Sequence, residues 1–250
     1  MLEVSAISQV FGGVTALENV SFCASQGAIT GVIGPNGAGK TTLFNIITGI
    51  YQQTSSRVRL EGKDISGLPP ERLARRGLVR TFQNIELFGA MTVLENVMVG
   101  LHTRSSSGIF SCSLKMPWCI VEERRIRAEA MKCLEFTAIA DLADVVAGNL
   151  PFGKGRLLEI ARALAVEPRI ILMDEPAAGL NSQETQALAR LIQAIRDMGI
   201  TVVLVEHDME LVMDICDRIV VLNLGRKLAE GTPREIQENP EVISAYLGDE

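Results

Sequence analysis

The sequence predicts an α/β fold, in which a parallel α/β core carries an N-terminal β portion and an inserted α-helical segment. Residues 1–30 have the pattern of short strands separated by glycine turns. From residue 169 onward, apolar runs alternate with helical patterns, which is typical of a parallel sheet with helical connections. Residues 92–166, between these parts, have mainly helical periodicity. No internal repeat is visible, and we treat residues 1–250 as a single domain.

The N-terminal part supplies the first strands and helices. The alternation in ENVSFCAS predicts a half-buried strand, and turns are predicted at Gly12–Gly13 and Gly27. The apolar run AITGVIG predicts a strand, and KTTLFNIITG predicts a helix that ends at Gly49. Residues 57–61 predict a further strand, followed by a turn at Gly62–Asp64 and a short helix in PPERLARRG.

The C-terminal part repeats a strand–helix alternation. Strands are predicted in RIILMD, TVVLVE, RIVVLN and RKLAEG. Helices are predicted near residues 183–197 and 208–215, and two more after Pro233 and Pro240. This alternation indicates a sheet built mainly from parallel strands.

The inserted segment has a different character. Helical patterns occupy TVLENVMVGL and residues 121–146, and HTRSSSGIFSCSLKMPW interrupts them. We therefore expect a core with its β subdomain in residues 1–88 and 167–250, and a helical subdomain in residues 89–166.

Composition argues against several classes of protein. The chain is 47% hydrophobic and 22% charged, a globular balance, and its net charge of −6 lacks the basic footprint of nucleic-acid binding. Its scattered cysteines have no C-x-x-C spacing, which argues against a disulfide framework or zinc site and fits a reducing cytoplasm. The N-terminus lacks a signal-peptide pattern, and no run of about 18 uncharged apolar residues predicts a membrane span.

The segment GPNGAGKT matches the phosphate-binding pattern G-x-x-x-x-G-K-[ST] between a predicted strand and a predicted helix. With the next residue it comprises Gly34, Pro35, Asn36, Gly37, Ala38, Gly39, Lys40, Thr41 and Thr42. The glycines allow backbone N–H groups to surround the β-phosphate, and Lys40 reaches the β- and γ-phosphate oxygens. The hydroxyl of Thr41 is expected to bind Mg²⁺.

The segment RIILMDEP is an apolar strand that ends in two carboxylates. Asp174 is expected to hold Mg²⁺ through its water shell, and Glu175 to polarise the attacking water as a general base. The alternative is a solvated strand end without a catalytic role.

Two further polar residues follow predicted strands. His207 in VEHDM is one of two histidines, and a lone histidine at a strand end is usually structural or placed on the surface. Gln83 in VRTFQN, taken alone, is an ordinary polar residue after a strand.

The order of these motifs resembles the ATP-binding subunit of ABC transporters over essentially the whole chain. The segments that carry the resemblance are GPNGAGKT, TFQN, LPFGKGR, ILMDEP, AAGLN and VEHD. The resemblance implies a P-loop NTPase core of the RecA-like type, with an N-terminal antiparallel β subdomain and an inserted α-helical subdomain. It also implies hydrolysis of ATP with Mg²⁺.

The resemblance implies roles for individual residues. Gln83 would bind Mg²⁺ and the attacking water and link them to the helical subdomain. His207 would contact the γ-phosphate, and Asp174 with Glu175 would complete the acid pair. Phe11 lies where the family stacks an aromatic ring on adenine; taken alone, an aromatic at this position would more often belong to the core.

The resemblance also places LPFGK at the family's signature motif, which binds the γ-phosphate of ATP held by a second subunit. The usual pattern is L-S-G-G-Q, and Pro151, Phe152 and Lys154 differ from it. Gly153, a helix N-terminus and the lysine cation still suit phosphate capture, with a degenerate half-site as the alternative. Asn181 stands in AAGLN where the family usually has aspartate.

Several longer segments resemble the ATPases of branched-chain amino-acid importers, among them FGGVTALENVSF, EPAAGLN and NPEVISAYLG. This implies a motor subunit on the cytoplasmic face of the inner membrane. Its partners would be membrane-spanning permease subunits, a second identical or different ATPase subunit, and a substrate-binding protein reached through the complex, without nucleic acid. The alternatives are an importer of short amides or urea, a soluble ABC ATPase acting on DNA or ribosomes, and a small-molecule kinase.

The segment from Met91 to Trp118 carries an unusual apolar load for a loop. Together with a residue shortly before it, the apolar side chains are Phe88, Met91, Ile109, Phe110, Leu114, Met116 and Trp118. They predict either a local core over the helical subdomain or, as the resemblance implies, a docking surface for the membrane subunit.

Overall fold

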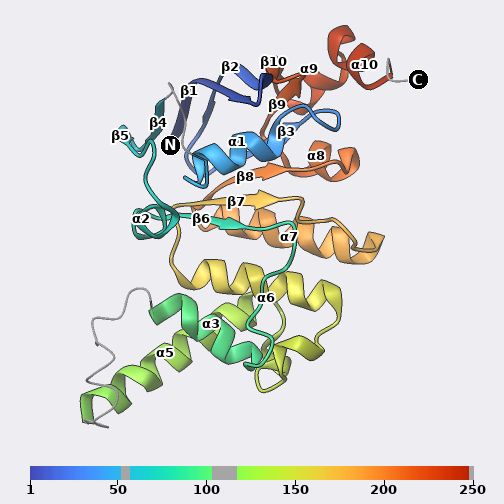
Figure 1. Cartoon of the computed structure of the whole chain (residues 1–250). Helices are drawn as coiled ribbons and strands as arrows, with labels where there is room; N and C mark the ends of the chain where they lie inside the picture. Colours follow the sequence, from blue (N-terminus) through green and yellow to red (C-terminus); the bar gives the residue numbers. More distant parts are fainter. Residues whose placement is uncertain (52–56, 103–116, 248–250) are drawn as a thin grey trace. The chain divides into compact units, whose positions relative to one another are not determined.

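The computed structural model describes residues 1–51, 57–102 and 117–247 (Figure 1). The chain folds into two compact units. The first unit is Met1–Gln83 with Arg169–Glu250, and the second is Asn84–Pro168. Among helices of the described ranges, none combines the length and apolar character that a membrane crossing needs.

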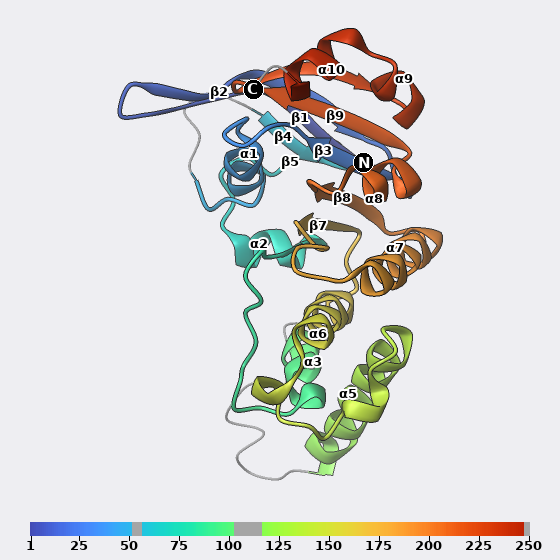
Figure 2. The same ribbon diagram turned by 90° about the vertical axis from the view of Figure 1, so that its right-hand side faces the viewer.

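The first unit contains a four-stranded antiparallel sheet in the order β2-β1-β4-β5. Its strands are β1 Leu2–Phe11, β2 Val14–Ala24, β4 Arg57–Leu60 and β5 Lys63–Asp64. The turn expected at Gly62–Asp64 lies one residue earlier, because Glu61 and Gly62 have φ of 50° and 75° and form a two-residue hairpin turn. Figure 2 shows the β1–β2 hairpin extending outward from its unit.

The second sheet of this unit has six strands in the order β10-β9-β3-β8-β7-β6. The strands are β3 Ile29–Ile33, β6 Leu78–Thr81, β7 Ile170–Asp174, β8 Thr201–Val205, β9 Arg218–Asn223 and β10 Arg226–Gly231. All are parallel except the edge strand β10. The registers pair Val32 with Val205, Val205 with Asp174, and Met173 with Thr81. The loops that follow β3, β6, β7 and β8 therefore leave the sheet at one edge.

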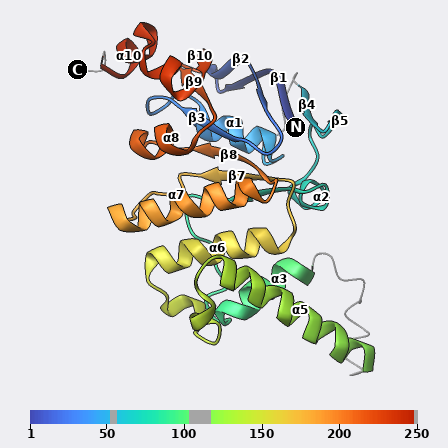
Figure 3. The same ribbon diagram turned by 180° about the vertical axis from the view of Figure 1, so that it is seen from behind.

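Helices cover both faces of these strands. They are α1 Lys40–Ile47, α2 Pro70–Arg75, α7 Ser182–Asp197, α8 Met209–Ile215, α9 Pro233–Gln237 and α10 Pro240–Leu247. Helix α1 contacts β2 and β7, and it buries Leu43 and Phe44 in the core shared by the two sheets (Figure 1). Helices α7 and α8 pack together on the opposite face, which Figure 3 shows.

The second unit is helical. It contains α3 Val93–His102, α5 Pro117–Phe136 and α6 Phe152–Ala165, with short 3-10 turns η1 Ala140–Leu142 and η2 Ala147–Asn149. The three α-helices contact one another around a buried apolar cluster of their own. This unit corresponds to the helical insertion that the sequence pattern predicts.

The helical pattern over residues 121–146 does not continue as one helix. Helix α5 ends at Phe136, and Ala138 takes the left-handed conformation with φ of 55°. The Ala138 amide bonds to the Glu135 carbonyl and the Ile139 amide to the Leu134 carbonyl, which is the Schellman termination. Alanine occupies the position where glycine usually signals this ending, so the sequence carries no visible stop.

Candidate functional site

The predicted phosphate loop connects β3 to α1 at the carboxyl edge of the six-stranded sheet. Gly34 and Gly39 have φ of 152° and 100°, values that L side chains rarely adopt. A Cβ at Gly34 would lie 2.1 Å from the Leu222 carbonyl oxygen, and one at Gly39 would lie 2.7 Å from the Ala16 carbonyl oxygen. The backbone of the neighbouring strands therefore requires glycine at both positions.

The remaining residues of the loop differ in exposure. Asn36, Gly37 and Thr41 are exposed, whereas Ala38 is buried. The other members, Pro35 and Thr42, are half-buried. Thr41 and Thr42 lie in the first turn of α1, where backbone N–H groups are free of helical partners. The loop thus offers amides, a hydroxyl and a lysine to an anion.

Lys40 is buried, and its Nζ donates hydrogen bonds to the carbonyl oxygens of Gly34 (2.7 Å) and Pro35 (3.0 Å). Burial lowers the pKa of Lys40, while the charges of Glu175 and Asp174 act in the opposite direction. The charges of the acid pair at the end of β7 therefore favour the protonated form of Lys40.

Asp174 is the last residue of β7, and it is buried. Its Oδ2 lies 2.5 Å from Nη2 of Arg80 in β6, and both side chains are almost fully buried. Arg80 also donates to Asn45 Oδ1 (2.7 Å) and Thr48 Oγ1 (3.1 Å), which belong to α1 and the residue after it. Arg80 therefore fixes one oxygen of Asp174 and ties β6 and β7 to α1. No motif of the sequence marks Arg80, so it was not among the predicted site residues.

Glu175 lies between the two polar residues predicted after neighbouring strands. Its Oε2 accepts a hydrogen bond of 2.7 Å from Nε2 of Gln83, and its Oε1 lies 3.0 Å from Nε2 of His207. The structure thus brings together three predicted site residues that follow β6, β7 and β8. Their convergence depends on the aligned ends of these parallel strands.

Glu206 is a second polar residue at this edge that was not among the predicted site residues. It follows β8 directly, it is buried, and its carboxylate accepts hydrogen bonds from the amides of Ala177, His207 and Asp208. Burial raises the pKa of Glu206, the three amide bonds lower it, and Asp208 raises it further. All residues of β8 are buried, and Glu206 follows this strand directly. A carboxylate at the end of the apolar run TVVLV was the sequence signal that could have revealed it.

Phe11 is the last residue of β1, at the tip of the β1–β2 hairpin, and 42% of it is exposed. Its ring meets Tyr51 edge-on, with 5.3 Å between the ring centroids. An exposed aromatic face on a hairpin can stack on a planar base.

The predicted signature residues belong to the second unit. Pro151 is the residue before α6 rather than its first helical residue, and α6 begins at Phe152. Phe152 and Pro151 are exposed, whereas Gly153 and Lys154 are half-buried. Because proline has no side-chain hydrogen-bond acceptor, it leaves the first amides of α6 without a side-chain cap, which suits an anion.

Asn181 has a structural role in the turn before α7. Its Oδ1 accepts hydrogen bonds from the amides of Gln183 and Glu184, and Glu184 bonds back to the Asn181 amide, each at 3.0 Å. This capping box uses the acceptor that asparagine shares with aspartate.

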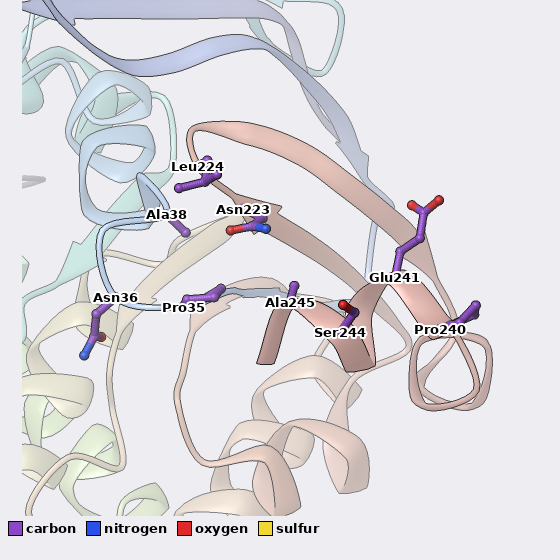
Figure 4. Close-up of a pocket in the computed structure, with 9 residues that line it drawn as sticks. All are labelled: Pro35, Asn36, Ala38, Asn223, Leu224, Pro240, Glu241, Ser244 and Ala245. Atoms are coloured by element: carbon purple, nitrogen blue, oxygen red, sulfur yellow. The ribbon is translucent and has the colours of Figure 1, made fainter. Parts of the chain in front are cut away.

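A pocket of about 740 Å³ lies beside the phosphate loop, between the loop, the β9–β10 turn and α10 (Figure 4). Pro35, Asn36 and Ala38 form one wall, and Ser244 and Ala245 of α10 form another. Burial raises the pKa of Tyr246 in α10 to about 12, against the opposing effect of a hydrogen bond from the Gly34 amide. Helix α10 thus supports the outer side of the loop.

Of the apolar segment considered as a docking surface, Phe88 and Met91 are described and exposed. Arg162 lies over the Phe88 ring, 5.6 Å from its centroid. Ile109, Phe110, Leu114 and Met116 lie outside the described residues, as does the side chain of Trp118.

The donor set suits Mg²⁺ bound together with phosphate. Within the described ranges, no three His, Cys, Asp or Glu side chains cluster as metal ligands. Magnesium usually takes one or two protein groups and completes its shell with phosphate oxygens and water, so a cluster of three such side chains is not required. The Thr41 hydroxyl, the carboxylate of Asp174 and the Gln83 amide provide ligands of the type it prefers.

A phosphate loop between β3 and α1, with an acid pair at the end of a neighbouring parallel strand, defines the chain as a P-loop nucleotide hydrolase. The chain belongs to the ABC transporter family, whose model matches residues 17–178, and it is an ATPase of that family. A second model, described as branched-chain amino acid ATP-binding cassette transporter, matches residues 226–250.

Curated relatives match over the full chain. The high-affinity branched-chain amino acid transport ATP-binding protein BraF of Pseudomonas aeruginosa is 46% identical over 250 residues, covering 100% of this chain and 98% of its own. The corresponding protein LivG of Escherichia coli is 45% identical over 254 residues, with the same coverage. The probable LivG of Methanocaldococcus jannaschii is 36% identical over 253 residues, again with 100% and 98% coverage.

Solved structures share the fold. A nucleotide-free ATP-binding cassette of an ABC transporter has a TM-score of 0.86 and 36% identity, covering 100% of this chain and 99% of its own. A cassette in its ADP conformation has a TM-score of 0.86 and 35% identity, with the same coverage. A bacterial cassette solved as a dimer has a TM-score of 0.79 and 27% identity, covering 94% and 99%. The predicted fold class, and the assignment to the ABC ATPases, are therefore confirmed.

Proposed function

We propose that this chain is the ATP-hydrolysing motor subunit of an ABC importer for branched-chain or related amino acids. The observation that carries the proposal is the convergence of Gln83, Glu175 and His207 beside the phosphate loop. The full-length identity to branched-chain amino acid transport ATP-binding proteins supports the transported class.

The residues of the first unit divide the chemistry between them. Backbone amides of residues 36–42 and the Lys40 ammonium bind the β- and γ-phosphates, and Phe11 stacks on adenine. Thr41, Asp174 and Gln83 hold Mg²⁺. Bound Mg²⁺ supplies positive charge that balances the phosphate oxygens.

Glu175 acts as the general base of hydrolysis. Its carboxylate accepts a proton from the water that attacks the γ-phosphate. Gln83 and His207 hold the two oxygens of this carboxylate, so its orientation is set before the reaction. His207 also presents its imidazole to the γ-phosphate.

We propose that the second unit is the helical subdomain and that its signature residues act on a second ATPase subunit. Pro151, Phe152, Gly153 and Lys154 would present the N-terminus of α6 and a cation to the γ-phosphate held by that subunit. The permease subunits would hold the ATPase pair at the cytoplasmic face of the inner membrane, and a substrate-binding protein would deliver the amino acid.

Transport in a reconstituted complex tests this proposal. The chain is co-purified with the membrane subunits encoded beside it, placed in vesicles with internal or external ATP, and given binding protein and labelled leucine, urea or acetamide. We expect leucine uptake that requires ATP on the side of the ATPase and disappears with Glu175→Gln. Uptake of urea or acetamide without leucine would reject the amino-acid assignment, and purification with nucleic acid instead of membrane subunits would reject the importer.

A further inference from the structure

The carboxylate of Glu206 joins the turn that carries Glu175 to the turn that carries His207. Its Oε1 accepts a hydrogen bond of 2.7 Å from the Ala177 amide, two residues after Glu175. Its Oε2 accepts one of 3.0 Å from the His207 amide and a longer one of 3.4 Å from Asp208. One side chain therefore satisfies amides from two segments that are far apart in sequence.

The burial and the charge of Glu206 make the hydrogen bonds to its carboxylate costly to lose. The residue is 3% exposed, so water cannot replace a lost acceptor. Bonds from amides to an ionised carboxylate are stronger than bonds between neutral groups. The two oxygens of Glu206 therefore hold the two turns together at a buried point.

The Glu175 turn needs such support because its backbone is unusual. Glu175 has φ of 47°, in the left-handed region that a non-glycine residue rarely adopts. Its amide donates at 2.9 Å to the carbonyl of Val205, the residue directly before Glu206. Backbone in this region persists where surrounding contacts hold it.

We propose that Glu206 is a positioning residue for hydrolysis: it sets the distance between the Glu175 and His207 side chains by binding the backbone of both turns. The proposal rests on the catalytic roles assigned above to Glu175 and His207. Glu206 itself is buried, so it acts on the reaction only through these turns.

The substitution Glu206→Gln isolates the role of the carboxylate. Glutamine has the same shape, but it offers one acceptor oxygen and an NH₂ donor, so it cannot accept bonds from both Ala177 and His207. We expect kcat for ATP to fall about 10- to 100-fold, the effect of one charged hydrogen bond, with KM within about twofold. The exposed Glu210→Gln is the matched control and should retain wild-type kcat.

A double-mutant cycle with His207→Ala decides whether Glu206 acts through the histidine turn. If it does, Glu206→Gln should lower kcat by a clearly smaller factor in the His207→Ala background than in the wild-type protein. Hydrogen exchange should show a loss of protection either at the Ala177 amide or at the His207 and Asp208 amides in Glu206→Gln, because one of the two acceptor oxygens becomes an NH₂ group. The variant Glu206→Asp, which keeps both acceptor oxygens, is measured in the same way and should show the same coupling.

A wild-type kcat in Glu206→Gln, or full additivity with His207→Ala in both the Gln and Asp variants, would overturn the positioning role. A lower midpoint of unfolding with unchanged kcat would likewise reduce Glu206 to a structural residue. The proposed function fails separately, because its failure would appear as normal turnover in Glu175→Gln and His207→Ala themselves.

Discussion

Nε2 of His207 lies 3.0 Å from Oε1 of Glu175, although the two residues follow different strands and are separated by 32 positions. The other oxygen of the same carboxylate accepts a bond from Gln83. A carboxylate held on both oxygens has one orientation, and a general base must have its acceptor aimed at one water. The cluster is therefore preorganised by three strands of a single sheet.

The phosphate loop provides the first prediction. Lys40→Ala removes the cation expected at the β- and γ-phosphates, so hydrolysis should fall at least about 100-fold. Fluorescent-nucleotide titration and phosphate release measure binding and turnover. The exposed Lys132→Ala on α5 carries the same change elsewhere and should behave as wild type. Equal turnover in both variants would remove Lys40 from the site.

The buried ion pair of Arg80 and Asp174 provides the second prediction. Arg80→Gln leaves the Asp174 carboxylate buried without its counter-charge, and breaking such a pair costs about 3–5 kcal/mol in the free energy of unfolding. Urea denaturation measures this loss, with the exposed Arg75→Gln as control. A loss below about 1 kcal/mol, the level of a solvent-exposed pair, would show that Arg80 does not hold Asp174.

The N-terminus of α6, where the signature residues lie, provides the third prediction. Gly153→Asp places a carboxylate where the γ-phosphate of a second subunit would approach, and like charges at low dielectric repel strongly. ATP-driven dimerisation should be lost while nucleotide binding by the monomer remains. Sedimentation with ATP distinguishes the two effects. Gly89→Asp, in the same unit and with room for a side chain, is the control that should still dimerise.

The sheet and its site were predictable to different degrees. The loop at residues 34–41, Asp174 and Glu175 could be found because each lies where a short apolar run ends, a pattern that local sequence carries. Arg80 could not, because its importance comes from register: it is an ordinary charged residue until β6 aligns with β7. Glu206 directly follows an apolar run, but its bond to the Ala177 amide exists only where β7 and β8 align. The end of α5 escaped prediction for a different reason, since alanine takes the left-handed position there.

Buried Glu206 provides the fourth prediction, on pH. Burial holds its pKa above the ordinary value of 4.5, assisted by Asp208 and opposed by three amide bonds. Between 4.5 and that higher value the folded state binds more protons than the unfolded state, so the free energy of unfolding should fall as pH rises through this window. Glu206→Gln should lack this slope. A wild-type-minus-variant difference that stays constant with pH would contradict the raised pKa.

The most direct test of this mechanism is ATP hydrolysis by Glu175→Gln. Because the amide cannot accept the proton from water, hydrolysis should fall about 100-fold or more while ATP affinity stays near the wild-type value, and ATP-bound dimers should accumulate. Glu238→Gln, an exposed change at the end of α9, should hydrolyse ATP normally. Single-turnover hydrolysis by wild type and both variants measures the chemical step itself. Turnover by Glu175→Gln at the wild-type rate would contradict the central claim that this carboxylate, held between Gln83 and His207, drives the reaction.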